Sequence, residues 1–153
     1  MAIVDDEDPI VRGLNFGDSG YMLIRRDKEG VPQKVFRTQE RQYRFNAPWQ
    51  CGTGKPLPTN ADVFLHFVQH NDVLVLASDG VFDNATESDI LNCIRPTNEK
   101  WDINAQSAAK CIADKSLELS KDKNYDSPFA INSRAANKPH VGGKKDDITV
   151  VVS

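Results

Sequence analysis

VLVLASDGVFDN, at residues 73–84, joins an apolar run to the turn residues Ser-Asp-Gly. A short, continuous apolar run of this kind is typical of a strand that is buried on both faces of a sheet. Asp79 therefore stands where a central strand ends, and a second acid, Asp83, follows on the same turn. A rigid strand that ends in an acid and a glycine is a typical placement for an active-site residue.

Strand-like segments fill the first half of the chain, and helices fill much of the second half. Apolar patterns predict strands at residues 10–16, 21–26, 31–37, 62–69 and 73–78. The first three read as an antiparallel meander. Further patterns predict a helix capped by Thr86, helices at 105–121 and 129–135, and a last strand at 146–153. This order favours an α+β fold over regular βαβ alternation.

Length and charge narrow the function classes. A chain of 153 residues suits one domain, and 39% hydrophobic with 27% charged residues is typical of a soluble globular protein. The net charge of -3 does not favour nucleic acid as a partner. No run approaches the roughly 20 apolar residues of a membrane-spanning helix. The acidic start, MAIVDDEDP, does not have the composition of a transit peptide.

The three cysteines, Cys51, Cys93 and Cys111, are widely spaced and form no CxxC pair. An odd number at these spacings predicts neither a disulfide framework nor a zinc site. Cys93 and Cys111 fall on apolar helix faces, so we expect core thiols and, from them, a reducing compartment.

Three acids stand where a predicted strand meets a turn: Asp18, Asp79 and Asp146. Carboxylates at strand ends can converge on one point while the sheet holds them rigidly. They are hard oxygen ligands of the kind that Mg²⁺ and Mn²⁺ prefer. The basic pair Lys144-Lys145, directly before Asp146, reads as a solvated pair.

Two phosphatase chemistries begin with a pattern like VLVLASDG. The aspartyl-phosphate chemistry of the haloacid dehalogenase type needs a nucleophilic Asp two residues before Asp79, and Ala77 stands there. Alanine cannot attack phosphorus, so that chemistry is excluded. The other chemistry needs no nucleophilic side chain, because divalent ions roughly 4 Å apart activate a water molecule. It needs carboxylates on several strands, which this chain offers.

Three segments, in this order, resemble the metal-dependent type 2C (PPM) serine/threonine protein phosphatases: LNFGDSGYMLIR, VLVLASDGVFDN and GGKKDDITVVV. Two further segments, QYRFNAPWQC and KDKNYDSPFA, resemble the branch of that family found in mitochondria and plastids. The resemblance covers most of the chain. It implies a sandwich of two antiparallel sheets flanked by helices, in the order α/β/β/α.

The resemblance also implies roles for four acids. Asp79 and Asp146 match metal ligands of the family, while Asp18 and Asp83 match residues that help to hold an additional, weaker metal in some members. Asp147 falls where many members have Asn and is not assigned as a ligand. The complete domain would use two or more Mg²⁺ or Mn²⁺ ions to hydrolyse phosphoserine and phosphothreonine in proteins.

The family's first half carries an Asp-Gly motif whose Asp bridges two metals, and an Arg that grips the substrate phosphate. Neither is found in this chain. Its sole Asp-Gly pair, Asp79-Gly80, already matches a different motif of the family. Residues 1–153 therefore resemble the C-terminal part of one such domain, with an incomplete sandwich. No catalytic group is identified in this chain itself.

The expected function is thus that of a metal-dependent protein phosphatase, of which these 153 residues form only a part. One alternative is a non-catalytic, phosphoprotein-binding module. Another is a product with no stable fold, because half of a sandwich exposes sheet edges and one apolar face. The branch resemblance implies mitochondria or plastids, although no transit peptide is visible.

Overall fold

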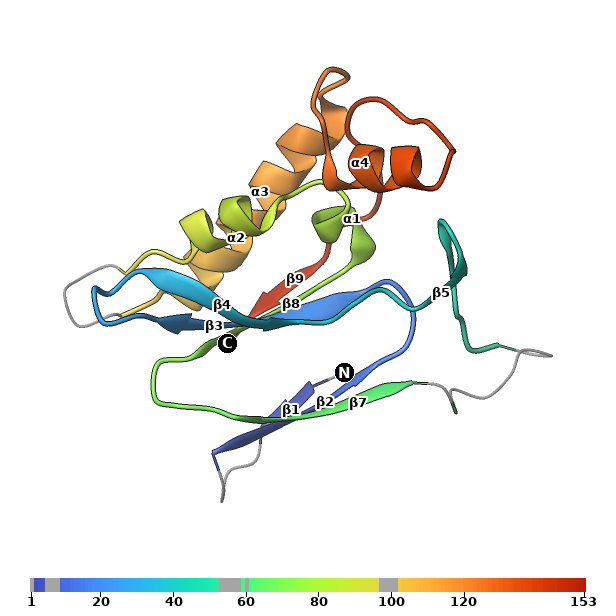
Figure 1. Cartoon of the computed structure of the whole chain (residues 1–153). Coiled ribbons are helices and arrows are strands. Elements are labelled where there is room, and N and C mark those ends of the chain that lie inside the picture. Colours follow the sequence, from blue (N-terminus) through green and yellow to red (C-terminus); the bar gives the residue numbers. More distant parts are fainter. Residues whose placement is uncertain (1, 5–8, 53–58, 60, 97–101) are drawn as a thin grey trace.

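The computed structural model describes residues 2–4, 9–52, 59, 61–96 and 102–153. They form three layers, in which helices cover a four-stranded sheet and a three-stranded sheet lies against its other face (Figure 1). The α+β fold is confirmed. Of the four layers of a complete α/β/β/α sandwich, the described residues supply one helix layer and the two sheets, in keeping with the incomplete sandwich predicted for this chain.

Both sheets are antiparallel throughout. The larger has the order β4-β3-β8-β9, made of Pro32–Arg37, Gly20–Arg26, Val73–Ala77 and Val150–Val152. The smaller has the order β1-β2-β7, made of Ala2–Val4, Ile10–Asn15 and Asp62–Phe67. A separate short hairpin joins β5 (Gln42–Arg44) to β6 (Ala47–Pro48). The helices are α1 (Asp79–Phe82), α2 (Glu87–Cys93), α3 (Ala105–Lys121) and α4 (Pro128–Ala135).

The predicted meander is wrong at its first connection. β2 pairs with β1 and β7, whereas β3 pairs with β4 and β8 in the other sheet. The turn at 17–20 carries the chain from one sheet to the other, and Gly17 adopts a φ of 110° that favours glycine. Asp18 therefore lies at a corner between the two sheets rather than in a hairpin.

The central strands are buried on both faces, as the apolar run at 73–78 predicts. In β3, Met22 and Ile24 face the helices, whereas Tyr21 and Leu23 face the smaller sheet. In β8, Val75 and Leu74 divide in the same way. The two hydrophobic cores thus share β3 and β8. Because Asp79 follows β8 closely, it lies at a rigid position.

The smaller sheet has an apolar outer face. Val63, Leu65 and Phe67 alternate along β7 and are 76%, 49% and 73% exposed. Within the part of the chain that the structure describes, no helix covers this face (Figure 1). An apolar row on an uncovered sheet is typical of a surface that packs against another element.

The helices follow their sequence signals closely. Thr86 and Asp89 form the predicted capping box at the start of α2, and α3 spans the predicted residues.

The last strand is shorter than predicted, because β8 ends at Ala77 and leaves residues 146–149 without a partner strand. The short α1 and β1 were not predicted. Among the described residues, no helix is both long and apolar enough to cross a membrane.

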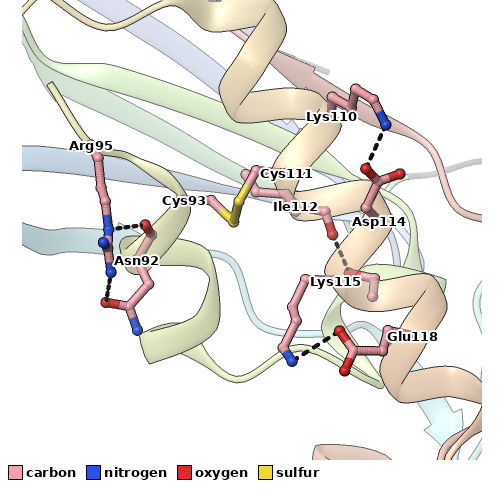
Figure 2. The surroundings of a disulfide bond; sticks show 10 residues. Asn92, Cys93, Arg95, Lys110, Cys111, Ile112, Asp114, Lys115 and Glu118 are labelled. Atoms are coloured by element: carbon pink, nitrogen blue, oxygen red, sulfur yellow. Dashed lines mark hydrogen bonds and ion pairs between the residues drawn. A yellow bond between two sulfur atoms is a disulfide. The ribbon is translucent and has the colours of Figure 1, made fainter. Parts of the chain in front are cut away.

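A disulfide joins Cys93 on α2 to Cys111 on α3, so the prediction of two core thiols is wrong (Figure 2). The two helices pack side by side over the larger sheet and bring the Cα atoms to 5.6 Å. Sequence spacing alone did not indicate this, because the two positions meet through helix packing. The expectation of a reducing compartment, which rested on free thiols, loses its basis.

Replacing both Cys93 and Cys111 by serine is expected to lower the free energy of unfolding by about 3 kcal/mol, because the bond restrains a loop of intermediate length in the unfolded chain. Urea denaturation without reductant measures the effect. Cys51→Ser is the matched control, since Cys51 is an exposed free cysteine. Equal midpoints for all three proteins would show that the bond does not stabilise the fold.

Candidate metal centre

Asp79 lies at the junction of a buried strand and a short helix. β8 ends at Ala77, Ser78 is extended, and Asp79 begins α1. The backbone N–H of Gly80 donates a hydrogen bond to Asp79 Oδ1 over 2.9 Å. This bond fixes one carboxylate oxygen, and the other, Oδ2, faces the segment before β9 and accepts a hydrogen bond from Lys144.

Asp83 follows Asp79 by one turn and is the C-cap residue of α1. Residues four apart on a helix lie on one side, so the two carboxylates face the same space. Asp83 is 6% exposed. Burial raises the pKa of Asp83 to about 6, against the opposing effect of a hydrogen bond from Lys144.

Asp146 reaches the same space from the far end of the sequence. The β8–β9 pairing aligns Ala77 with Val150, and the residues before β9 then pass over the start of α1. Ser78 holds them there, because its hydroxyl donates to the Asp147 carbonyl over 2.9 Å and accepts from the Thr149 N–H over 3.1 Å. Hydrogen bonds to the Ser78 side chain thus hold residues 146–149, which were predicted to belong to the last strand.

Gly80 makes the close approach possible. A Cβ atom at this position would overlap the Asp147 carbonyl oxygen and lie 3.3 Å from the Cβ of Asp146. The glycine of Ser-Asp-Gly therefore serves to let the segment with Asp146 approach the one with Asp79, as well as to form a turn.

The result is a carboxylate cluster, formed by Asp79, Asp83 and Asp146, in which one oxygen from each acid lies within 4.8 Å of the others. Three oxygen donors at this spacing fit a hard divalent cation such as Mg²⁺ or Mn²⁺. The structure thus brings together three of the four acids that the sequence singled out. Their assignment as ligands remains a prediction.

Asp18 lies beside the carboxylate cluster but outside it. Burial raises the pKa of Asp18, and so does the charge of Asp79. Glu40, which the sequence analysis did not single out, lies in the same region. Burial raises its pKa, as does the charge of Asp18. Glu40 sits in an irregular loop, where no pattern could have indicated it.

Lys144 is the unexpected member of the site. Its Nζ lies 3.0 Å from Asp79, 2.6 Å from Asp83 and 3.0 Å from Asp146. The prediction of a solvated Lys144-Lys145 pair is therefore wrong for Lys144, whose side chain is 18% exposed, and holds for the exposed Lys145. Desolvation alone would lower the pKa of Lys144, but the three carboxylates raise it overall.

Asn84 was also missed by the sequence analysis. It is fully buried, and its amide donates to the carbonyls of Gly80 and Lys144 over 2.9 and 2.8 Å. Its Oδ1 accepts the Lys144 N–H over 2.8 Å. One side chain thus ties α1 to the segment before β9, and the Asn that follows Asp83 in VFDN was its only sequence signal.

Comparisons with known proteins show strong similarities, although no family model matches the chain. It is 37% identical over 145 residues to the probable protein phosphatase 2C 55 of Arabidopsis thaliana, covering 94% of this chain and 30% of the relative. It is 32% identical to the human protein phosphatase PTC7 homolog, covering all of this chain and 52% of the relative. The photosystem II phosphatase PBCP superimposes with a TM-score of 0.81 at 27% identity, over 99% of this chain and 60% of that one.

The chain therefore spans about half the length, or less, of the curated relatives it matches. The similarity to the solved structure of the photosystem II phosphatase confirms the sandwich architecture that the sequence predicts.

Proposed function

We propose, from the relationship of this chain to the metal-dependent type 2C (PPM) protein phosphatases, that it forms the metal-holding part of a protein serine/threonine phosphatase. The observation that carries the proposal is the convergence of Asp79, Asp83 and Asp146 from two segments distant in sequence. Sequence similarity over nearly the whole chain to named phosphatases supports it. The comparisons give no support to the non-catalytic binding module.

Each acid has a role in this proposal. Asp79 and Asp146 hold a divalent ion, and Asp83 with Asp18 supports a further one. Mg²⁺ and Mn²⁺ are the ions proposed, because all the donors are carboxylates. When bound at such a site, these ions lower the pKa of water and polarise phosphoryl oxygens. The rigid end of β8 and the Ser78 hydrogen bonds keep the acids in place without rearrangement.

The chain is proposed to be the C-terminal part of a single domain. The uncovered apolar face of β7 supports this, since in a complete α/β/β/α sandwich a second helix layer would cover it. The chain also covers only 52% of the human relative and 60% of the photosystem II phosphatase, so about half of each relative has no counterpart in this chain. The phosphate-binding and bridging groups, which have no counterpart in this chain, would then belong to the remaining part.

The substrates proposed are proteins that carry phosphoserine or phosphothreonine, since the relatives are named protein phosphatases. A mitochondrial or plastid location is proposed from two similarities. One is the likeness to the PTC7 homologs, and the other is the likeness to a photosystem II phosphatase.

The proposal is tested on the protein tagged at its own gene and purified from its source cells. Phosphate release from phosphoserine and phosphothreonine peptides is expected with Mn²⁺ or Mg²⁺ and is expected to stop with EDTA. Intact mass distinguishes a longer domain from a chain near 17.1 kDa. Absence of turnover with both metals, or turnover in EDTA, would contradict the proposed function.

A further inference from the structure

We propose that Lys144 is a built-in competitor for the cation position of the carboxylate cluster. Its ammonium group neutralises the three acids when metal is absent, and it must leave when a divalent ion binds. This inference rests on the proposed function, because it concerns the same site. It adds that the chain sets its own metal affinity through one lysine.

The first support is the position of the charge. The Nζ atom reaches an oxygen of each acid in the carboxylate cluster, at 2.6 to 3.0 Å. These three acids are also the group whose oxygens lie within 4.8 Å of one another. An ammonium group in that space and a divalent ion bound to the same oxygens would repel strongly, because two cations a few ångströms apart interact unfavourably in a partly buried site.

The second support is that Lys144 is held in place on both sides. Asn84 anchors its backbone through hydrogen bonds to the N–H and the carbonyl. The Phe129 ring lies 5.0 Å from Nζ, within the range of a cation–π contact. Phe129 is itself fixed, because its N–H donates to the Asp83 carbonyl over 3.0 Å. A lysine held in this way differs from a mobile surface lysine that meets an acid by chance.

Two opposite effects follow from this arrangement. Removing the charge of Lys144 leaves three neighbouring carboxylates without compensation, and because one of them, Asp83, is buried, this destabilises the metal-free fold. The same removal takes away the cation that an incoming metal must displace, which strengthens metal binding. A lysine with only a structural role would give a different result, because its loss would weaken both the fold and the site.

Lys144→Met tests the inference in the tagged protein purified from its source cells, since methionine keeps much of the apolar stem and removes the charge. Mn²⁺ affinity is measured by electron paramagnetic resonance, and urea unfolding is measured in EDTA. We expect Mn²⁺ to bind at least about tenfold more tightly and the EDTA midpoint to fall. Lys145→Met is the matched control and should change neither quantity, while Lys144→Arg should bind Mn²⁺ as weakly as the wild type.

If Lys144→Met does not fold in EDTA, its thermal midpoint at increasing Mn²⁺ gives the affinity instead, because binding to the folded form raises the midpoint. Equal or weaker Mn²⁺ binding by Lys144→Met would overturn the inference and leave the metal site standing. Absence of Mn²⁺ binding in the wild type and in every variant would overturn the metal site itself, and the inference with it.

Discussion

Asp79→Asn is expected to weaken Mn²⁺ binding by the chain at least about a hundredfold. Asp79 is at the centre of the site, since it begins α1, interacts with Lys144 and shares the carboxylate cluster with Asp83 and Asp146. An amide has nearly the same shape but no charge. Changes to residues that only support a ligand already cost 10- to 100-fold, so the loss of an anionic ligand should cost at least as much. In the purified protein the same change should remove metal-dependent phosphate release.

The matched control is Asp147→Asn. Asp147 is exposed, follows Asp146 directly, and contributes its backbone carbonyl rather than its carboxylate to the site. Calorimetric titration with Mn²⁺ compares the two variants, and circular dichroism checks that both fold. Full binding and activity in Asp79→Asn would refute the assignment of the metal centre, whereas equal losses in both variants would point to a general effect of charge.

Local patterns predicted the elements well. The apolar run at 73–78 is a central strand, and the threonine-capped helix and α3 lie where their signals place them. Asp18, Asp79 and Asp146, at or next to strand ends, were expected to converge. Asp79 and Asp146 do so, together with Asp83, whereas Asp18 lies outside the carboxylate cluster. These features depend on periodicity, helix caps and strand ends, which are determined by a few residues that are neighbours in sequence.

The features that were missed depend on contacts between distant segments. The alternation in 10–16 and 21–26 is the same whether the two strands pair or lie in different sheets, so it could not exclude the meander. Cys93 meets Cys111 only because α2 packs on α3. Lys144 looks like a surface lysine in sequence, and it turns inward because Asn84 holds its backbone beside three acids.

Gly80→Ala is expected to move Asp146 away from Asp79 and Asp83 in the carboxylate cluster. The added Cβ would lie 3.1 Å from the Asp147 carbonyl carbon and overlap its oxygen, so the segment with Asp146 must move away from α1. We expect Mn²⁺ binding to weaken at least about tenfold, because Asp146 no longer reaches the ion that Asp79 holds. The free energy of unfolding should fall by roughly 1–3 kcal/mol, the usual cost of an added methyl group in a packed site.

Gly30→Ala separates this effect from the general cost of replacing a glycine. Gly30 has a positive φ of 81°, but a Cβ there meets no atom within 4 Å. Its replacement should therefore lower stability through backbone strain and leave Mn²⁺ affinity unchanged. Mn²⁺ titrations and urea unfolding of both variants distinguish the two effects. Wild-type affinity in Gly80→Ala would mean that Asp146 does not contribute to the ion's binding, and that the approach of the two segments serves the fold alone.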